Sequence, residues 1–327
     1  MIRVYSLEKY REMITSRNVN LVLNVLLESY GSPIKPDNIA KTTGLSMLEV
    51  VEAIDVLKEL GLYVDYSPNL GYTLPLNDNL NLIPKMLFGI GDVILLKEVE
   101  STMDIAWELV MKGAPSWTIV IAETQTKGRG RAGRAWLSPK GGLWFSVIIR
   151  LKHSIEYIKT LGLACSASVA ESIRILTGLD AWVKWPNDIM LNKSKLGGVL
   201  IESEHVGDRC NIVVGCGINV NNQPPKVDRE TTSIIAHTKK ITSRPQLLRM
   251  IILRMKGLLL MLKTIGPKTI VDYWKQYSRI IGNRVRVVQA EGSFEGIAID
   301  INDECSLIVR RDDNSIVKIY DADIELL

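Results

Sequence analysis

Seven residues near the middle of the chain, Gly128-Arg129-Gly130-Arg131-Ala132-Gly133-Arg134, restrict the fold more than any other segment. Their spacing matches G-x-G-x-x-G, but a dinucleotide-binding loop must lead directly from a strand into a helix. Here Thr124–Lys127 intervene before the segment, and Trp136 and a strand beginning at Leu143 follow it. The segment is therefore a loop of another kind, and a Rossmann fingerprint is excluded at this position.

The same loop predicts an anion-binding site. Its backbone N–H groups are unobstructed by side chains, and Arg129, Arg131 and Arg134 can each hold phosphate or carboxylate oxygens. A flexible, solvated basic loop and an RNA-binding Arg-Gly segment are the alternatives that composition leaves open.

A second dense segment is centred on lysines. Lys184-Trp185-Pro186-Asn187-Asp188 is followed, six residues later, by a run from Lys195 through Gly197-Gly198 to Glu202. Lys184 is predicted to end a strand, Asn187 and Asp188 to lie at a turn, and the paired glycines to let another group approach the backbone. The alternative is a hairpin with solvated lysines and a structural tryptophan.

The length of 327 residues indicates two or three domains. We predict an α+β protein with a helix-turn-helix and β-wing over 1–78, a mixed α/β domain over 79–281 and a small β-barrel over 282–327. In the mixed domain, strands are expected at 92–97, 117–123, 143–151, 181–184, 197–202 and 211–219, and helices at 155–177, 245–265 and 267–277. In the last domain, strands are expected at 285–288, 294–299, 306–309, 316–320 and 324–326.

The first domain has recognisable helix signals. A helix over Pro36–Thr43 is followed by a third that begins after Ser46, with Glu49 as its capping-box partner, and runs to about Leu60. Alternating apolar and polar residues over Gly61–Leu74 predict the wing.

Charge and cysteine usage narrow the class of protein. Residues 1–80 carry seven Lys or Arg and ten Asp or Glu, a net charge of −3, so the rest of the chain carries +7 and is the part that would attract anions. Four scattered cysteines and three dispersed histidines predict neither disulfides nor a zinc site. With no apolar run long enough to cross a bilayer and no signal peptide, we expect a cytoplasmic protein that does not contact membranes.

Five motifs taken in order resemble those of the biotin protein ligases. They are Glu100-Ser101-Thr102-Met103-Asp104, Ala122–Trp136, Lys184–Asp188, Lys195–Glu202 and Gly217-Ile218-Asn219-Val220-Asn221. The likeness implies the layout of the bifunctional ligase/repressor members: a winged helix-turn-helix, a biotin/lipoate-ligase-like domain and an SH3-like barrel. It also implies the reaction, in which biotin and ATP form biotinoyl-5′-AMP and the biotin is passed to a lysine of a biotin carboxyl carrier protein. ATP with Mg²⁺ is the implied cofactor, and no metal beyond Mg-ATP is expected.

The resemblance carries roles onto individual residues. Residues expected at biotin are Ser101, Thr102, Met103, Gln125, Arg129, Gly130, Arg131 and Lys195. Residues expected at ATP are Arg134, Trp136, Asn187 and Asn219, the two asparagines near the phosphates and Mg²⁺. Catalytic roles are expected for Arg131, Lys195, Asp188 and Lys184, with Asp188 orienting or deprotonating the incoming lysine. Met103 departs from the family, where asparagine is common.

The expected third helix departs from the repressor pattern. Between Ser46 and Asp55 it carries three acids and no base, which a DNA duplex would repel. We therefore favour a packing, dimerisation or partner role over operator binding, and leave a homodimer open. Two other functions also remain open: a biotin-sensing regulator without ligase activity, and a lipoate or octanoate transferase.

Overall fold

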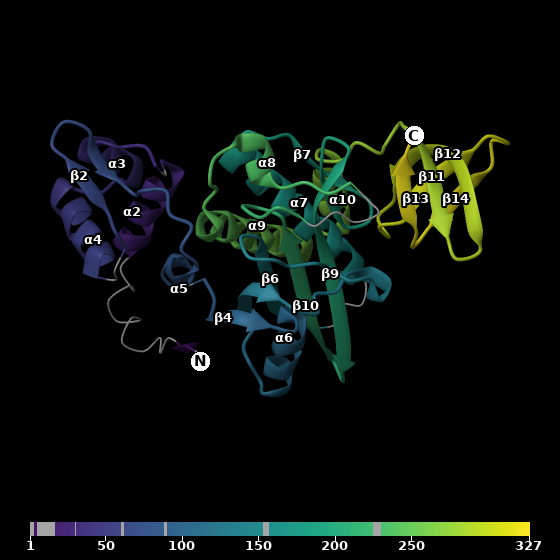
Figure 1. Ribbon diagram of the computed structural model, residues 1–327, viewed down its shortest axis with the longest axis horizontal. Helices are drawn as coiled ribbons and strands as arrows, with labels where there is room; N and C mark the ends of the chain where they lie inside the picture. The colour runs from purple at the N-terminus through teal and green to yellow at the C-terminus, as the bar shows by residue number, and fades with distance from the viewer. Residues whose placement is uncertain are drawn as a thin grey trace.

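Three bodies follow one another along the long axis of the molecule (Figure 1). The computed structural model describes residues 3–4, 17–29, 31–59, 62–87, 90–152, 157–224 and 230–327. Three predicted boundaries, the helix end at Leu60, the wing start at Gly61 and the helix start at residue 155, lie outside these ranges.

The N-terminal body contains three helices and a hairpin: α2 (Arg17–Glu28), α3 (Pro36–Thr43), α4 (Met47–Glu59), β2 (Asp65–Ser67) and β3 (Gly71–Thr73). The predicted capping box is present, because Ser46 Oγ accepts from Glu49 N at 3.3 Å and Glu49 Oε2 accepts from Ser46 N at 2.8 Å. Gly44 ends α3 with a φ of +72°, which glycine adopts without strain. The apolar faces of the helices and the hairpin share a hydrophobic core of their own.

A short connection, η1 (Leu80–Leu82) and α5 (Ile83–Met86), leads into the central body. The two bodies also meet at helix α9 (Arg244–Thr264). Gln246 donates to the carbonyl of Leu27 at 2.7 Å, and Arg249 donates to the carbonyl of Met86 and, at 2.5 Å, to Asn24 Oδ1. Specific polar contacts thus hold the N-terminal body against the central one.

An eight-stranded mixed sheet forms the central body, in the order β1-β4-β5-β6-β10-β9-β8-β7. Its strands are β1 (Arg3–Val4), β4 (Val93–Val99), β5 (Ile119–Gln125), β6 (Leu143–Lys152), β7 (Ala181–Lys184), β8 (Asp188–Leu191), β9 (Ser194–Val206) and β10 (Arg209–Ile218). Only the β4/β5 pair is parallel among the described strands of this sheet. Although the sequence groups residues 3–4 with the first domain, β1 pairs with β4 of this sheet.

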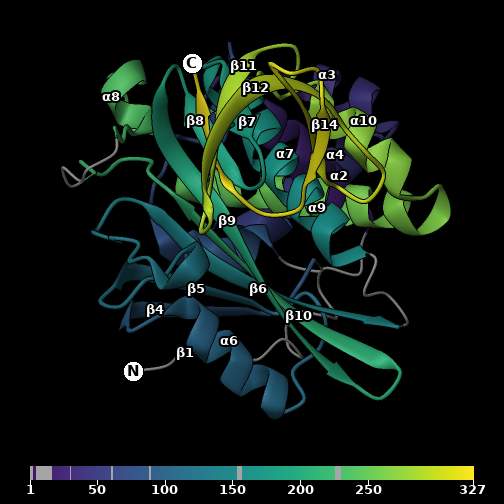
Figure 2. The same cartoon turned by 90° about the vertical axis from the view of Figure 1, so that its right-hand side faces the viewer.

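Helices cover both faces of the sheet (Figure 2). Alternate residues of β5 point to opposite faces: Val120 packs with α6 (Thr102–Met111), whereas Ile119 and Ile121 pack into the main core. That core also takes the buried faces of α7 (Tyr157–Thr177), α9 and α10 (Pro267–Lys275). Apolar residues on both sides of the strands explain why the sheet is buried.

The C-terminal body is an antiparallel sheet of five strands in the order β14-β13-β12-β11-β15. They are β11 (Arg284–Gln289), β12 (Gly292–Ile301), β13 (Leu307–Arg311), β14 (Ile316–Ile319) and β15 (Asp323–Leu326). The expected closed barrel is not seen within residues 280–327, because β14 and β15 remain as edges. The loop between β12 and β13 contacts the central body: Cys305 O accepts from Trp185 Nε1 at 3.0 Å, and its Sγ lies 3.3 Å from Thr160 Oγ1. The buried apolar residues of the sheet belong to the same hydrophobic core as those of the central body.

Some elements of the central body were not anticipated. Helix α6 begins after the N-cap Ser101, and β8 begins at Asp188, which the sequence assigned to a turn. The short helix α8 (Ile234–Thr238) is also additional. None of the described helices is long and apolar enough to cross a membrane.

Candidate active site

A pocket of about 390 Å³ opens where the loop after β5, the start of α6, the β7–β8 turn and the ends of β9 and β10 meet. Its wall is lined by Ser101, Thr102, Met103, Gln125, Arg129, Gly130, Arg131, Arg134, Ala135, Trp136, Leu137, Phe145, Asn187, Asp188, Lys195, Gly198, Val199, Leu200, Gly215, Cys216, Gly217, Asn219, Pro224, Thr231 and Asp323. Both segments singled out in the sequence therefore line one cavity.

Hydroxyl and amide side chains line one part of the pocket. Thr102 donates through its backbone N to Gln125 Oε1 at 2.8 Å, and its hydroxyl lies 3.0 Å from that oxygen and 2.8 Å from Ser146 Oγ. Gln125 in turn donates to Ser138 Oγ at 2.8 Å. Met103 packs against Gly215, where an added Cβ would lie 2.5 Å from its Sδ. These contacts fix the hydroxyl and amide groups of this part of the pocket.

The glycine-arginine loop is held in a definite shape by its own backbone. Gly130 N donates to Arg134 O at 2.7 Å, and Trp136 N donates to Gly128 O at 2.8 Å. A Cβ on Gly128 would lie 2.4 Å from the Trp136 carbonyl oxygen, so this close approach requires glycine. The turn at its tip contains Ala132 at a φ of +54°.

Arg129 fastens the start of the loop to β9. Its Nε and Nη2 donate to the two carboxylate oxygens of Glu202 at 2.9 and 3.1 Å, and its Nη1 contacts Ser101 Oγ at 3.2 Å and Asp104 Oδ1 at 2.5 Å. The bond to Glu202 is the main reason that the pKa of Arg129 is raised. Trp107 Nε1 also donates to Glu202, at 2.7 Å, so the carboxylate is itself held in place.

Two carboxylates of the C-terminal body pair with the rest of the loop. Asp323 accepts from Arg134 Nη1 at 2.7 Å and from Nη2 at 3.1 Å, and Asp321 forms an ion pair with Arg131. Burial lowers the pKa of Arg131, although Asp323 and Asp188 oppose this effect. The cationic end of the pocket therefore depends on a strand and a turn that lie in a different domain.

Asp188 lies between two ammonium groups. Its Oδ1 is 2.6 Å from Lys195 Nζ, and its Oδ2 is 3.3 Å from Lys184 Nζ. Burial alone would raise the pKa of Asp188, but Lys195 and Lys184 outweigh it and lower the pKa below its ordinary value. Lys195 also lies 5.2 Å from the centre of the Trp136 ring, within the range of a cation–π contact.

The tryptophan is set tightly against β10. An added Cβ on Gly217 would lie 2.4 Å from Trp136 Nε1. That nitrogen is buried and has no hydrogen-bond partner in the described part of the chain. Glycine at 217 is thus what permits the indole to lie at the pocket wall.

The two asparagines have different surroundings. Asn187 donates to Val199 O at 2.5 Å and its Oδ1 lies 3.4 Å from Arg131 Nη1, so both ends of the amide are engaged. Asn222 Oδ1 accepts from the backbone N of Val220 at 3.0 Å, which leaves its Nδ2 to donate to Asn219 Oδ1 at 2.9 Å. Asn222 thus holds the amide of Asn219, which lines the pocket.

All the residues predicted for the site line the pocket except Lys184, which contacts Asp188 from behind. The sequence reasoning missed Asp321 and Asp323, Glu202 as the partner of Arg129, and Ser146 as a partner of Thr102. The charge of the arginine-rich loop indicates that carboxylates pair with it. The sequence does not indicate which carboxylates these are.

Comparisons with known proteins agree with this geometry. The chain matches the biotin/lipoate A/B protein ligase family over residues 95–219 and the biotin protein ligase C terminal domain over residues 280–327. The bifunctional ligase/repressor BirA of Bacillus subtilis is 32% identical over 305 residues, which cover 90% of this chain and 94% of the relative. The chain belongs to the biotin protein ligase family.

Other relatives of this ligase extend the comparison. BirA of Escherichia coli is 29% identical over 84% of this chain and 88% of its own length. The solved structure of the biotin protein ligase from Aquifex aeolicus, in complex with biotin and ATP, has a TM-score of 0.61 and 29% identity, covering 72% of this chain and 98% of that one. Membership of this family makes the chain an enzyme, a ligase, with a mixed α/β fold followed by a β-rich C-terminal domain.

Proposed function

We propose that the chain joins biotin to ATP and then passes the biotin to a lysine of a biotin carboxyl carrier protein. In the first step a carboxylate oxygen of biotin attacks the α-phosphorus of ATP. An O–P bond forms, the bond between the α- and β-phosphates breaks, and pyrophosphate leaves with the bonding electrons. In the second step the lysine amine attacks the acyl carbon, AMP leaves, and the amine loses a proton.

The observation that supports this proposal is that uncharged polar groups and cations line the same pocket. Ser101, Thr102 and Gln125 offer uncharged hydrogen-bonding groups suited to the ring system of biotin, and Arg131 and Lys195 bring positive charge. Biotin and ATP are both anions, so a site that brings them together must neutralise their repulsion. Preorganised cations can lower such a barrier by several kcal/mol.

Roles for individual residues follow from their contacts. We assign Lys195 and Arg131 to the carboxylate and the α-phosphate, Arg129 and Gly130 to the biotin side of the loop, and Met103 to the apolar wall. Arg134, Trp136 and Asn219 are assigned to the nucleotide side. Asn187 and Asn219 both line the pocket, and they are assigned to the phosphates and Mg²⁺ of the nucleotide.

Asp188 and Lys184 are assigned together. With one lysine on each carboxylate oxygen and a lowered pKa, Asp188 orients Lys195 and remains ionised. Lys184 acts through Asp188, so it is a positioning residue and not one that touches the substrate. A lysine arriving from the carrier protein would find Asp188 as its nearest buried carboxylate at the pocket wall.

Mg²⁺ is proposed to enter the pocket with the phosphates of ATP, and no step above is assigned to it. Among the described residues, no group of three or more His, Cys, Asp or Glu side chains is arranged to hold a metal ion, and the oxygens of Asp188 are engaged by lysines.

Labelled biotin, ATP and Mg²⁺ incubated with the chain and a carrier domain test the proposal directly. We expect the label on the carrier, and pyrophosphate release that needs biotin. Lipoate and octanoate, offered in parallel, should not replace biotin. Label on the carrier from lipoate but not from biotin would assign the chain to the other branch of its family, and binding of biotin without transfer would make it a sensor.

We also propose that the N-terminal body is a winged helix-turn-helix that does not read an operator. Its helix α4 exposes Met47, Leu48 and Val51, with exposed fractions of 43%, 68% and 37%, beside the acids Glu52 and Asp55. Apolar and acidic groups suit a protein partner better than a polyanion. Salt-dependent binding to the DNA upstream of its own gene, measured by gel shift, would contradict this assignment.

The open C-terminal sheet is proposed to be the counterpart of the SH3-like barrel of the family. Its order of five antiparallel strands and its match to the family's C-terminal domain support this assignment. We retain 1–78, 79–281 and 282–327 as the proposed domain limits, with the cytoplasm as the proposed compartment.

A further inference from the structure

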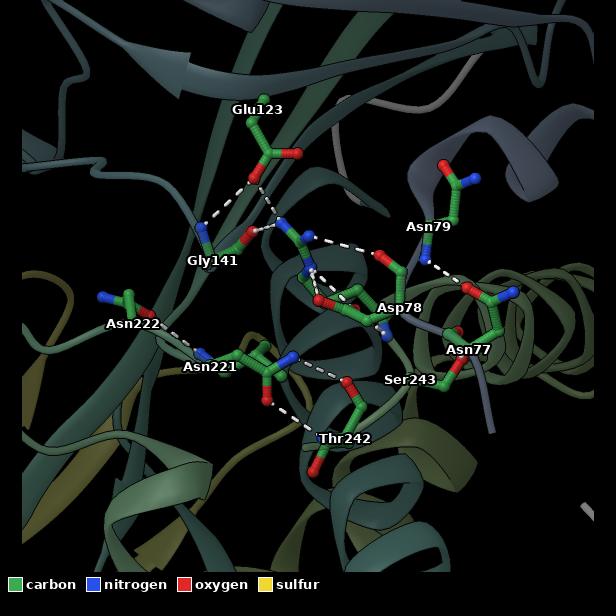
Figure 3. A network of polar contacts seen from close by, with 12 residues as sticks. Asn77, Asp78, Asn79, Glu123, Gly141, Asn221, Asn222, Thr242 and Ser243 are labelled. Carbon is green, nitrogen blue, oxygen red and sulfur yellow. Dashed lines mark hydrogen bonds and ion pairs between the residues drawn. The ribbon is translucent and has the colours of Figure 1, made fainter. Parts of the chain in front are cut away.

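A buried arginine, Arg244, joins the segment that leaves the N-terminal body to Glu123 and to the turn at 141–142. Figure 3 shows the network of polar contacts that includes Asp78, Glu123 and Asn221. Arg244, in the first turn of α9, is 4% exposed. Its Nε donates to both carboxylate oxygens of Asp78, at 2.8 and 2.9 Å, and its Nη1 donates to Glu123 Oε1 at 2.9 Å and to the carbonyl of Gly142 at 3.1 Å. One cation thus connects two carboxylates and a backbone turn that are far apart in the sequence.

From Arg244 the contacts continue to Asn221. Glu123 Oε1 also accepts from Gly141 N at 3.3 Å, and Gly141 O accepts from Asn221 N at 2.8 Å. Gly141 has a φ of +98°, and an added Cβ would lie 3.1 Å from Asn221 O, so the two backbones are in close contact. Glu123 lies two residues before Gln125 on β5, which ties the same network to the other end of the pocket.

A parallel route runs through the residues before α9. Ser243 donates through its hydroxyl to the carbonyl of Asn77 at 2.7 Å. Thr242, its neighbour, donates its N to Asn221 Oδ1 at 2.9 Å and accepts from Asn221 Nδ2 at 2.8 Å. The segment at 77–78 is therefore connected twice to Asn221, which is followed by the Asn222 that orients Asn219.

We propose that Asp78 is a positioning residue for the nucleotide side of the pocket. Through Arg244 it holds the turn at 141–142 and the segment at 219–222, so that the docked N-terminal segment sets how well Asn219 meets its ligand. The inference rests on the proposed function, because it assumes that Asn219 faces the nucleotide. It adds a residue outside the pocket, from the connection to the N-terminal body, to the groups that determine nucleotide affinity.

The choice of substitution follows from the charges. Replacing Arg244 would leave two carboxylates facing each other with no cation between them, and the chain could fail to fold. Asp78→Asn keeps the shape of the side chain and leaves the Arg244–Glu123 ion pair intact. Asn79→Ala is the matched control, because Asn79 lies next to Asp78 but its side-chain oxygen accepts from Asn81, outside the network of Arg244.

The full-length variants are compared by pyrophosphate release and by calorimetric titration with ATP, which requires no catalysis. For Asp78→Asn we expect the KM and the dissociation constant for ATP to rise about fivefold, with kcat and the KM for biotin within about twofold of the parent. Asn79→Ala should match the parent. If Asp78 acts through Asn219, Asp78→Asn should cause no further loss of ATP affinity in an Asn219→Ala background.

Three results would overturn the inference: unchanged ATP affinity in Asp78→Asn, an equal rise in the constants for ATP and biotin, or a full additive loss in the double variant. Failure of the proposed function has a different signature. If only the proposed function fails, the parent chain binds ATP and Asp78→Asn weakens that binding, but no biotin-dependent pyrophosphate is released. A parent chain that does not bind ATP at all would overturn both.

Discussion

Lys195 Nζ lies 2.6 Å from Asp188 Oδ1, so the ammonium assigned to the biotin carboxylate is already paired before any substrate binds. A lysine held in this way cannot swing freely to meet its ligand, and its orientation is fixed in advance. Preorganisation of this kind lowers the cost of bringing the anions together in the transition state. It also means that removing Asp188 should disturb both folding and catalysis.

Replacement of Arg131 or Lys195, two of the cations that line the pocket, should abolish the first step. We expect Arg131→Ala and Lys195→Ala each to slow biotin-dependent pyrophosphate release by at least about 100-fold, because each removes charge that opposes two anions. Lys193→Ala removes an exposed lysine two residues from Lys195 and should leave the rate unchanged. A normal rate in either pocket variant would exclude that residue from adenylate formation.

The stability contribution of Asp188 should depend on pH. Its pKa is lowered in the folded chain, so its contribution is present above the unfolded value of about 3.9 and is lost as pH falls through the folded value. We expect Asp188→Asn to lower the free energy of unfolding by about 3 kcal/mol at pH 7, and by clearly less at pH 3. Urea unfolding at both values measures this, with Asp208→Asn, an exposed turn residue, as the control.

Glycine at 217 should be necessary for nucleotide binding. In Gly217→Ala the new methyl group would meet Trp136 Nε1 at 2.4 Å and displace the indole from the pocket wall. We expect the KM for ATP to rise on the order of tenfold while the fold is retained. Gly257→Ala, where an added Cβ meets nothing within 4 Å, is the control. An unchanged KM would mean that Trp136 does not contact the nucleotide.

Loosening of the loop can be detected by proteolysis. Glu202→Gln removes the charge that fixes Arg129, at a cost of about 1.5 kcal/mol, which corresponds to roughly tenfold faster trypsin cleavage within residues 129–134. Glu204→Gln, an exposed residue on the same strand, should cleave like the parent. If both variants are cleaved at the parental rate, Glu202 does not restrain the loop.

Short-range signals in the sequence predicted much of the fold. The capping box at Ser46 and Glu49, the turn at Gly44 and most strands of the central sheet depend on neighbouring residues or on periodicity, and these were found. The strand β8 was missed because it has only four residues and directly follows Asn187 and Pro186, which indicate a turn. Helix α6 was missed although Ser101 supplies an ordinary N-cap signal.

The site was predictable only where its residues lie in dense motifs. The arginine loop and the lysine segment were expected to share a pocket, and both line it. Ion-pair partners that lie far away in the sequence could not be predicted. Asp323 is 189 residues from Arg134, and Asp78 is 166 residues from Arg244. The spacing of the C-terminal strands led to the expectation of a closed barrel, because spacing does not tell whether the two edge strands, β14 and β15, pair with each other.

The ion pairs from Asp321 and Asp323 to the arginine loop would help to prevent unwanted acylation of other proteins. A mixed anhydride that escaped from its enzyme would acylate lysines indiscriminately. Arg131 and Arg134, which would bind the intermediate, are held by carboxylates of the C-terminal body. A molecule in which that body is unfolded therefore lacks a complete binding site and should not accumulate the reactive anhydride. Formation of the mixed anhydride would thereby require that the whole chain is folded, with its C-terminal sheet in place beside the arginine loop.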